Sequence, residues 1–212
     1  MNILNEWLGH ILVFIALILP VFYLKGYRKH GKAYDIFTWY LYFIAGVQFI
    51  MSLYAFEKIN NIFLFHFYFI GQFIFMSLFY YQLLKLKIIY IILGVGLALL
   101  AIQYTVTPGI FYVYHTVGVS LTQSVVVLYA LVYYYSSLSK VADFVYINTG
   151  VLLYFMTSIL FFASGNFFLE LDIPKEAKQK IGLVNEALYF VFQILIFIEW
   201  YKNYRKPKAL FN

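Results

Sequence analysis

The sequence predicts an all-α protein that crosses a membrane seven times. Of its 212 residues, 64% are hydrophobic and only 11% are charged, whereas about a quarter of the residues of a soluble domain are charged. The mean hydropathy is +0.83. The apolar residues gather into runs that are long enough to cross a bilayer as helices, and polar or basic connections separate these runs. We therefore expect one transmembrane domain that occupies residues 1–212.

Seven apolar segments supply the predicted spans: residues 7–24, 36–56, 62–84, 88–104, 110–138, 144–165 and 181–200. Basic stretches end the first and third spans, and polar turns end the second and fourth. Pro108-Gly109 marks the turn that leads into the long fifth span. Asp143 precedes the sixth span, where a carboxylate favours the start of a helix. A polar connection, residues 166–180, leads into the last span.

The positive charges predict the orientation of the bundle. Eleven of the 15 Lys and Arg residues fall in the tail or in connections on one side, and four fall on the other side. The positive-inside rule then places the N-terminus outside and the C-terminus in the cytoplasm, in the cytoplasmic (inner) membrane. The net charge of +6 is explained by this orientation and by contact with anionic lipid, so no nucleic-acid partner is expected.

Two further compositional features limit the chemistry and the packing. The chain has no Cys, which excludes disulfides, thiolate metal sites and a cysteine nucleophile. In the fourth span, Gly94, Ala98 and Ala101 share one helical face, and small residues at such spacing allow two membrane helices to approach closely. We expect this stripe to face another helix.

Polar residues in the last span indicate a functional site. Glu186, Tyr189 and Gln193 are spaced i, i+3 and i+7, so a helix places them on one face. Asn185 lies beside them. A carboxylate inside a span is costly unless it faces protein or water, which makes Glu186 a candidate for function. Glu199, near the inner boundary, is expected to pair with the cations of the tail.

Four titratable side chains are predicted to lie at one depth near the outer surface: His10, His66, His115 and Glu186. The rise of 1.5 Å per residue places them roughly 5–8 Å below the outer boundary. Other polar residues are expected at or below this level, namely Gln48, Ser52, Gln72, Ser164, Asn166, Asn185 and Gln193. The sequence does not reveal whether these side chains converge, because it leaves the order of the helices around the bundle open.

Three interpretations of this polar layer remain open. The side chains could hydrogen-bond between helices and specify packing. They could line an outward-facing pocket that binds a small molecule or a lipid head group. This ligand site would contain Gln48, His66, Gln72, His115, Asn185, Glu186, Tyr189 and Gln193. Finally, His10, His66, His115 and Glu186 could hold Zn²⁺ or a similar ion.

This chain lacks the residues that define several seven-span families. Microbial rhodopsins carry retinal on a lysine in the middle of the seventh span, and residues 181–200 contain no lysine, so no retinal Schiff base is expected. Ceramidase-like hydrolases have histidines in their last span, and this span has none. Sugar transporters built from three-span repeats use several intramembrane prolines, whereas only Pro20 lies inside a span here.

Two short segments resemble a family of uncharacterised bacterial seven-span integral membrane proteins. The string NNIFLFHFY (60–68) is similar to the start of that family's third span, and INTGVLLY (147–154) is similar to the start of its sixth. The family pattern has a carboxylate at the position of Gln72 and a histidine at that of Asn185 or Glu186, and this chain departs from it at both. The resemblance implies an integral membrane protein and names no activity.

The sequence therefore supports three hypotheses of function. The first is a sensor or binding module, with an outer polar pocket for a small molecule or lipid and with cytoplasmic loops that contact a protein partner. The second is a metal-dependent intramembrane hydrolase that acts on lipids, in which the metal would activate a water. The third is a transporter of a small solute. No motif assigns catalytic residues or a cofactor.

Overall fold

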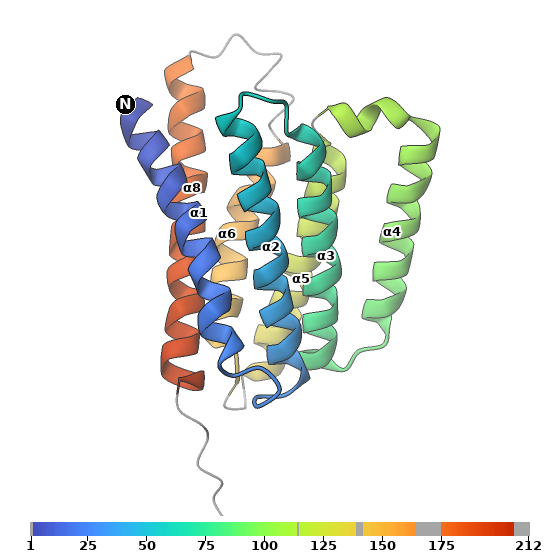
Figure 1. Ribbon diagram of the computed structural model, residues 1–212. Coiled ribbons are helices and arrows are strands. Elements are labelled where there is room, and N and C mark those ends of the chain that lie inside the picture. Colours follow the sequence, from blue (N-terminus) through green and yellow to red (C-terminus); the bar gives the residue numbers. More distant parts are fainter. Residues whose placement is uncertain (1, 114, 139–141, 164–174, 206–212) are drawn as a thin grey trace, which may run out of the picture.

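The computed structural model describes residues 2–113, 115–138, 142–163 and 175–205, and every regular element within them is helical (Figure 1). The all-α prediction is confirmed. A short 3-10 helix, η1 (Pro108–Tyr112), precedes α5, and a π-helical turn, η2 (Trp200–Tyr204), continues α8. The α-helices are α1 (Asn2–Leu24), α2 (Lys32–Phe56), α3 (Ile62–Leu84), α4 (Ile88–Val106), α5 (Thr116–Ser137), α6 (Val145–Ala163) and α8 (Lys175–Glu199).

The helices have the length and surface of membrane helices. Five segments are long and apolar enough to cross a bilayer: Lys32–Phe56, Ile62–Leu84, Ile88–Val106, Thr116–Ser137 and Gly182–Tyr204. Leu8–Leu24 and Val145–Phe161 are shorter apolar helices. Large apolar side chains such as Phe14, Leu99 and Leu128 are more than half exposed. Because a soluble protein rarely exposes so much apolar surface, this exterior suits a lipid environment.

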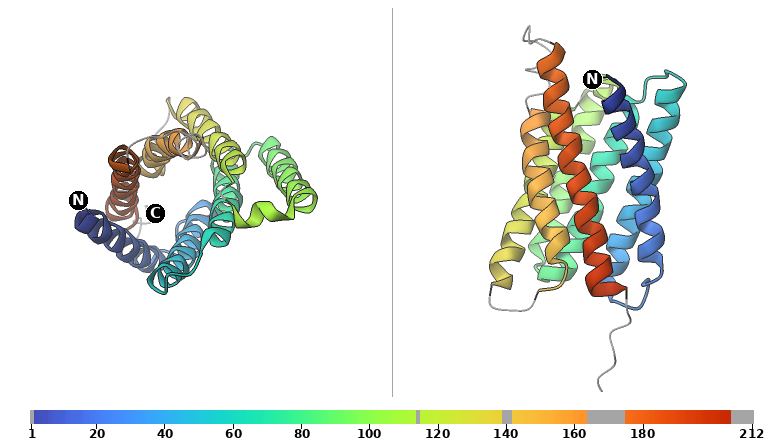
Figure 2. Two further views of the ribbon diagram at one scale, coloured as in Figure 1. Left: turned by 90° about the horizontal axis from the view of Figure 1, so that it is seen from above. Right: turned by 90° about the vertical axis from the view of Figure 1, so that its left-hand side faces the viewer.

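The helices α1, α2, α3, α5, α6 and α8 form a ring, and α4 packs outside it (Figure 2). Contacts of α1 with α8 and of α3 with α5 join helices that are not consecutive in the sequence. The main contacts of α4 are with α3 and η1. We call the end of the ring where α1 begins and α2 ends the outer end, after the predicted orientation, and the opposite end the inner end.

Aromatic side chains fill the interior of the ring. Tyr23, Tyr34, Phe37, Phe79 and Tyr80 are completely buried. They interlock through ring contacts, for example between Phe37 and Phe79 with centroids 5.3 Å apart. The hydroxyl of Tyr23 donates a hydrogen bond to the carbonyl of Ile196 at 2.9 Å and so ties α1 to α8. These contacts join the helices through a close-packed core.

Two glycines allow neighbouring helices to approach closely in this aromatic core. A Cβ atom on Gly71 would lie 2.0 Å from Cε1 of Phe43, and one on Gly150 would lie 2.4 Å from Cδ2 of Phe192. These positions bring α3 against α2 and α6 against α8. Glycine therefore serves here as a packing residue, as is common between membrane helices.

The fifth predicted span, residues 110–138, is shorter in the structure. Pro108 begins the 3-10 helix η1, Val113 is extended, and α5 starts only at Thr116. His115 is the N-cap residue of α5 rather than a residue inside the span. The apolar side chains of residues 110–113 continue the hydrophobic run without being part of the helix, which explains the difference.

Other boundaries and one packing face also differ from the prediction. α8 begins at Lys175, before the predicted residue 181, and residues 164 and 165 of the sixth predicted span lie outside the described residues. In α4, Gly94, Ala98 and Ala101 are exposed. Gly96 instead faces α3, where an added Cβ would lie 2.9 Å from Cε1 of Phe73. The expected packing stripe was therefore assigned to the wrong face.

Candidate functional site

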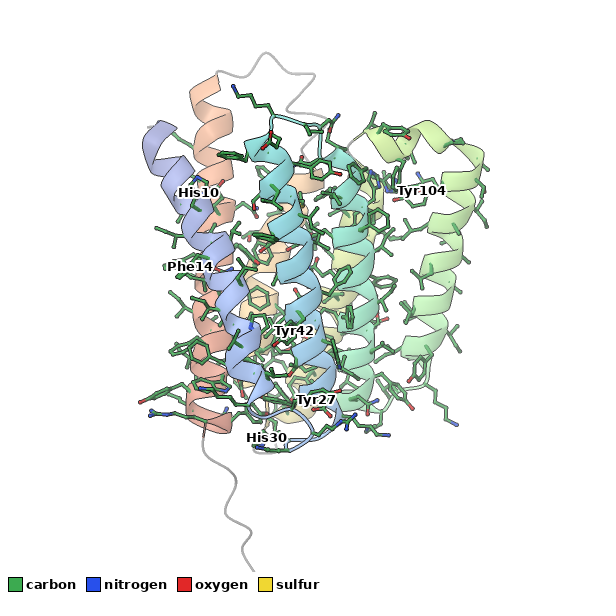
Figure 3. The ribbon with its side chains drawn as sticks, viewed as in Figure 1. His10, Phe14, Tyr27, His30, Tyr42 and Tyr104 are labelled. Atoms are coloured by element: carbon green, nitrogen blue, oxygen red, sulfur yellow. The ribbon has the colours of Figure 1, made fainter. Side chains whose placement is uncertain are left out.

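A cavity of about 720 Å³ opens at the outer end between α1, α2 and α8. We call it the outer groove. His10, which lines the groove, lies on the upper part of α1 (Figure 3). Its lining is mostly apolar, and the lining residues are Gly9, His10, Leu12, Val13, Gln48, Met51, Ser52, Ala55, Phe56, Glu186 and Tyr189. The size is that of a typical small-molecule site.

The helices place the polar side chains of the groove on facing walls. The side-chain nitrogen Nε2 of Gln48, on α2, donates a hydrogen bond to the hydroxyl of Tyr189, on α8, at 2.8 Å. One helical turn earlier on α8, Oε2 of Glu186 is buried and has no hydrogen-bond partner among the described residues. The hydroxyl of Ser52 donates to the carbonyl of Phe49 in its own helix. The groove thus contains a carboxylate with one buried oxygen that has no hydrogen-bond partner among the described residues.

Gln193 lies below the groove and links two of the helices that form it. This side chain is 1% exposed, and its Nε2 donates to the carbonyl of Leu12 at 2.9 Å, which joins α8 to α1. Deeper in the ring, Nε2 of Gln72 donates to the hydroxyl of Tyr40 at 3.2 Å. The predicted face of Glu186, Tyr189 and Gln193 therefore points inward, with the first two in the groove and the third below it.

The two buried histidines belong to a separate cluster formed by α3, α4, η1 and α5. His66 is fully buried, with Nδ1 2.6 Å from the hydroxyl of Tyr104 and Nε2 3.1 Å from the carbonyl of Val113. Because a carbonyl only accepts, Nε2 carries the hydrogen and Nδ1 accepts from Tyr104. His115 stacks on His66 with centroids 5.9 Å apart, and neither of its ring nitrogens has a hydrogen-bond partner among the described residues.

The four residues of the metal hypothesis are divided between these two places. His10 and Glu186 line the outer groove, whereas His66 and His115 lie in the histidine cluster. In the part of the chain that the structure describes, no group of three or more His, Cys, Asp or Glu side chains is placed to hold an ion. Both ring nitrogens of His66 are already hydrogen-bonded, so this side chain has no lone pair left for a metal.

A second cavity, of about 650 Å³, lies at the inner end. It is formed by the connection between α1 and α2, the last turns of α3 and α5, and the start of α6, and Lys32, Gln82, Lys85, Tyr133 and Asp143 are among its lining residues. Along α2, which reaches both cavities, the buried side chains of Phe37, Leu41 and Ile44 lie between them. Between its two cavity-lining ends, α2 therefore carries buried apolar side chains.

Glu199 is a buried carboxylate whose environment was not anticipated. It was expected to pair with cations of the tail, but it is fully buried, and its Oε2 accepts a hydrogen bond from the backbone N–H of Tyr146 at 2.9 Å. Oε1 accepts from Nδ2 of Asn203 at 2.6 Å, and Lys202 donates instead to the hydroxyl of Tyr146. A carboxylate at the start of α6 complements the helix dipole, so Glu199 anchors α6 to α8.

Comparison of the chain with protein-family models, with curated proteins and with solved structures gives no match. The class of the protein therefore follows from its own fold and site. It is an all-helical protein with membrane-type helices, arranged as a ring with one outlying helix and with a largely apolar groove at the outer end. Ser164 and Asn166, which were expected in the polar layer, lie outside the described residues.

Proposed function

We propose that this chain is a seven-span protein of the cytoplasmic (inner) membrane that binds an amphipathic small molecule or lipid in the outer groove and acts as a sensor. The N-terminus would lie outside and the C-terminus in the cytoplasm, because most of the Lys and Arg residues fall at the inner end. The two shorter apolar helices, Leu8–Leu24 and Val145–Phe161, would complete the set of seven spans.

The observation that carries this proposal is the composition of the groove. Leu12, Val13 and Met51 offer an apolar wall, while Glu186 and Gln48 offer hydrogen-bonding groups. A ligand that matches this arrangement has an apolar body and a polar head. The groove lies between helices rather than in a loop, so such a ligand could enter it from the bilayer.

Binding is favoured over the other two hypotheses for separate reasons. A metal-dependent hydrolase needs several ligands at one ion, and the described histidines and Glu186 are split between two places. A transporter needs a path to the inner side, and buried apolar residues of α2, such as Phe37, lie along that route. α1, α2 and α8 extend from the groove to the inner end, where a protein partner could detect a change in their positions.

A substitution that fills the groove tests the proposal. Ala55 lines the groove near its rim, so Ala55→Trp should occupy the space of the ligand. Ala98, on the exposed face of α4, supplies a matched control, Ala98→Trp. We expect saturable binding of radiolabelled dodecanol to wild-type protein in nanodiscs and to Ala98→Trp, and its loss in Ala55→Trp. Equal binding to all three proteins, after subtraction of empty nanodiscs, would place the site elsewhere and refute the proposal.

A further inference from the structure

The charges of the outer groove define the chemical class of its ligand more narrowly. Among the described residues that line the groove, Glu186 is the only acidic residue, and none is Lys or Arg. Its Oε2 is buried without a partner. A carboxylate shielded from water is stabilised by a cation or by strong hydrogen-bond donors, and the described walls of the groove supply neither to this oxygen.

In the described parts of α2 and α8, the buried polar side-chain atoms without a hydrogen-bond partner are all oxygens. Besides Oε2 of Glu186, they are Oε1 of Gln48, Oδ1 of Asn185 and Oε1 of Gln193. The amide orientation of Gln193 is fixed, because its Nε2 donates to the carbonyl of Leu12. Oxygens of this kind only accept hydrogen bonds, so the group that satisfies them must donate. An ammonium group donates several hydrogen bonds and accepts none.

We propose that the ligand is a cationic amphiphile, with an ammonium head beside Glu186 and an apolar chain along Leu12, Val13 and Met51. This inference rests on the proposed binding function of the same groove. The rings of Tyr189 and Phe56 also line the groove and provide aromatic faces for a cation. An anionic head would meet the like charge of Glu186, and among the described lining residues only His10 has a side chain that could offset it.

Three probes of equal chain length separate the contributions of charge and apolar burial: dodecylamine, dodecanol and dodecanoate. Saturable binding is measured to wild-type protein in nanodiscs of zwitterionic lipid, with empty nanodiscs subtracted. A charge-assisted hydrogen bond corresponds to a preference of roughly 10- to 100-fold. We expect dodecylamine to bind at least about 10-fold more tightly than dodecanol, and dodecanoate to bind most weakly.

Two variants test whether the preference for dodecylamine over dodecanol arises in the groove. Glu186→Gln keeps the size of the side chain and removes its charge, so it should bind dodecylamine and dodecanol with similar affinity. Continued binding of dodecanol shows that the variant is folded. Glu57→Gln removes the same charge from an exposed residue just beyond α2 that does not line the groove, and it should retain the full preference for dodecylamine.

The outcomes that overturn the inference differ from those that overturn the proposed function. If wild-type protein binds dodecanol or dodecanoate as tightly as dodecylamine, or if Glu186→Gln keeps the preference, the ligand is not recognised as a cation and the inference fails, while the binding function stands. If no probe binds saturably, both fail. If His10→Ala abolishes an observed preference for dodecanoate, the head group is an anion held by His10.

Discussion

Removal of the Glu199 carboxylate should destabilise the whole bundle. The side chain is fully buried and accepts hydrogen bonds from Tyr146 N–H and from Asn203. A hydrogen bond to a charged group contributes about 1.5–3 kcal/mol, and Asn203 is exposed and can bond to water once released. In Glu199→Ala the backbone N–H of Tyr146 would lose its acceptor, and this loss accounts for most of the destabilisation. We therefore expect Glu199→Ala to lower the free energy of unfolding by about 3 kcal/mol. Glu199→Gln retains one acceptor and should cost about 1 kcal/mol.

Titration with SDS in mixed micelles, followed by tryptophan fluorescence, measures this effect. Trp200 adjoins Glu199 and is only 7% exposed, so its emission should report unfolding. Glu57→Ala is the matched control, because it removes an exposed carboxylate whose loss should change stability by less than about 0.5 kcal/mol. If Glu199→Ala were as stable as Glu57→Ala, the carboxylate would not anchor α6 and the explanation would be wrong.

Two further predictions concern packing and the histidine cluster. Gly71→Ala should destabilise the protein by about 1–3 kcal/mol, because its Cβ would overlap the ring of Phe43. The control Gly46→Ala has no atom within 4 Å of its Cβ and should be neutral or slightly stabilising in the same titration. Tyr104→Phe removes the hydroxyl bonded to Nδ1 of His66 and should lower the free energy of unfolding by about 1–3 kcal/mol. An unchanged unfolding midpoint would contradict this prediction.

The sequence allowed the helices and their polar faces to be predicted well. The bounds of α3 are those expected, because its apolar run ends at a basic stretch. Helical periodicity also placed Glu186, Tyr189 and Gln193 on one inward face. These successes depend on local properties, namely hydropathy and a repeat of 3.6 residues.

What could not be predicted depends on contacts between distant segments. Periodicity places His10 and His66 at similar depths but does not say which helices are neighbours, so the split between the groove and the histidine cluster was not foreseen. Glu199 was misjudged for a related reason, since its partner Tyr146 lies on α6. The order of the spans nevertheless indicated this contact, because two consecutive antiparallel spans bring the end of α8 beside the start of α6.

The central claim, that the outer groove is the ligand site, is tested most directly by mapping where a ligand sits. A dodecylamine that carries a photoreactive diazirine midway along its chain would be crosslinked to the protein in nanodiscs, and the modified residues would be identified by mass spectrometry. We predict modification within residues 9–13 of α1 and 48–56 of α2 that unlabelled dodecylamine suppresses. Suppressible labelling confined to the lipid-facing surfaces of α4 and α5, with none in the groove, would contradict the claim.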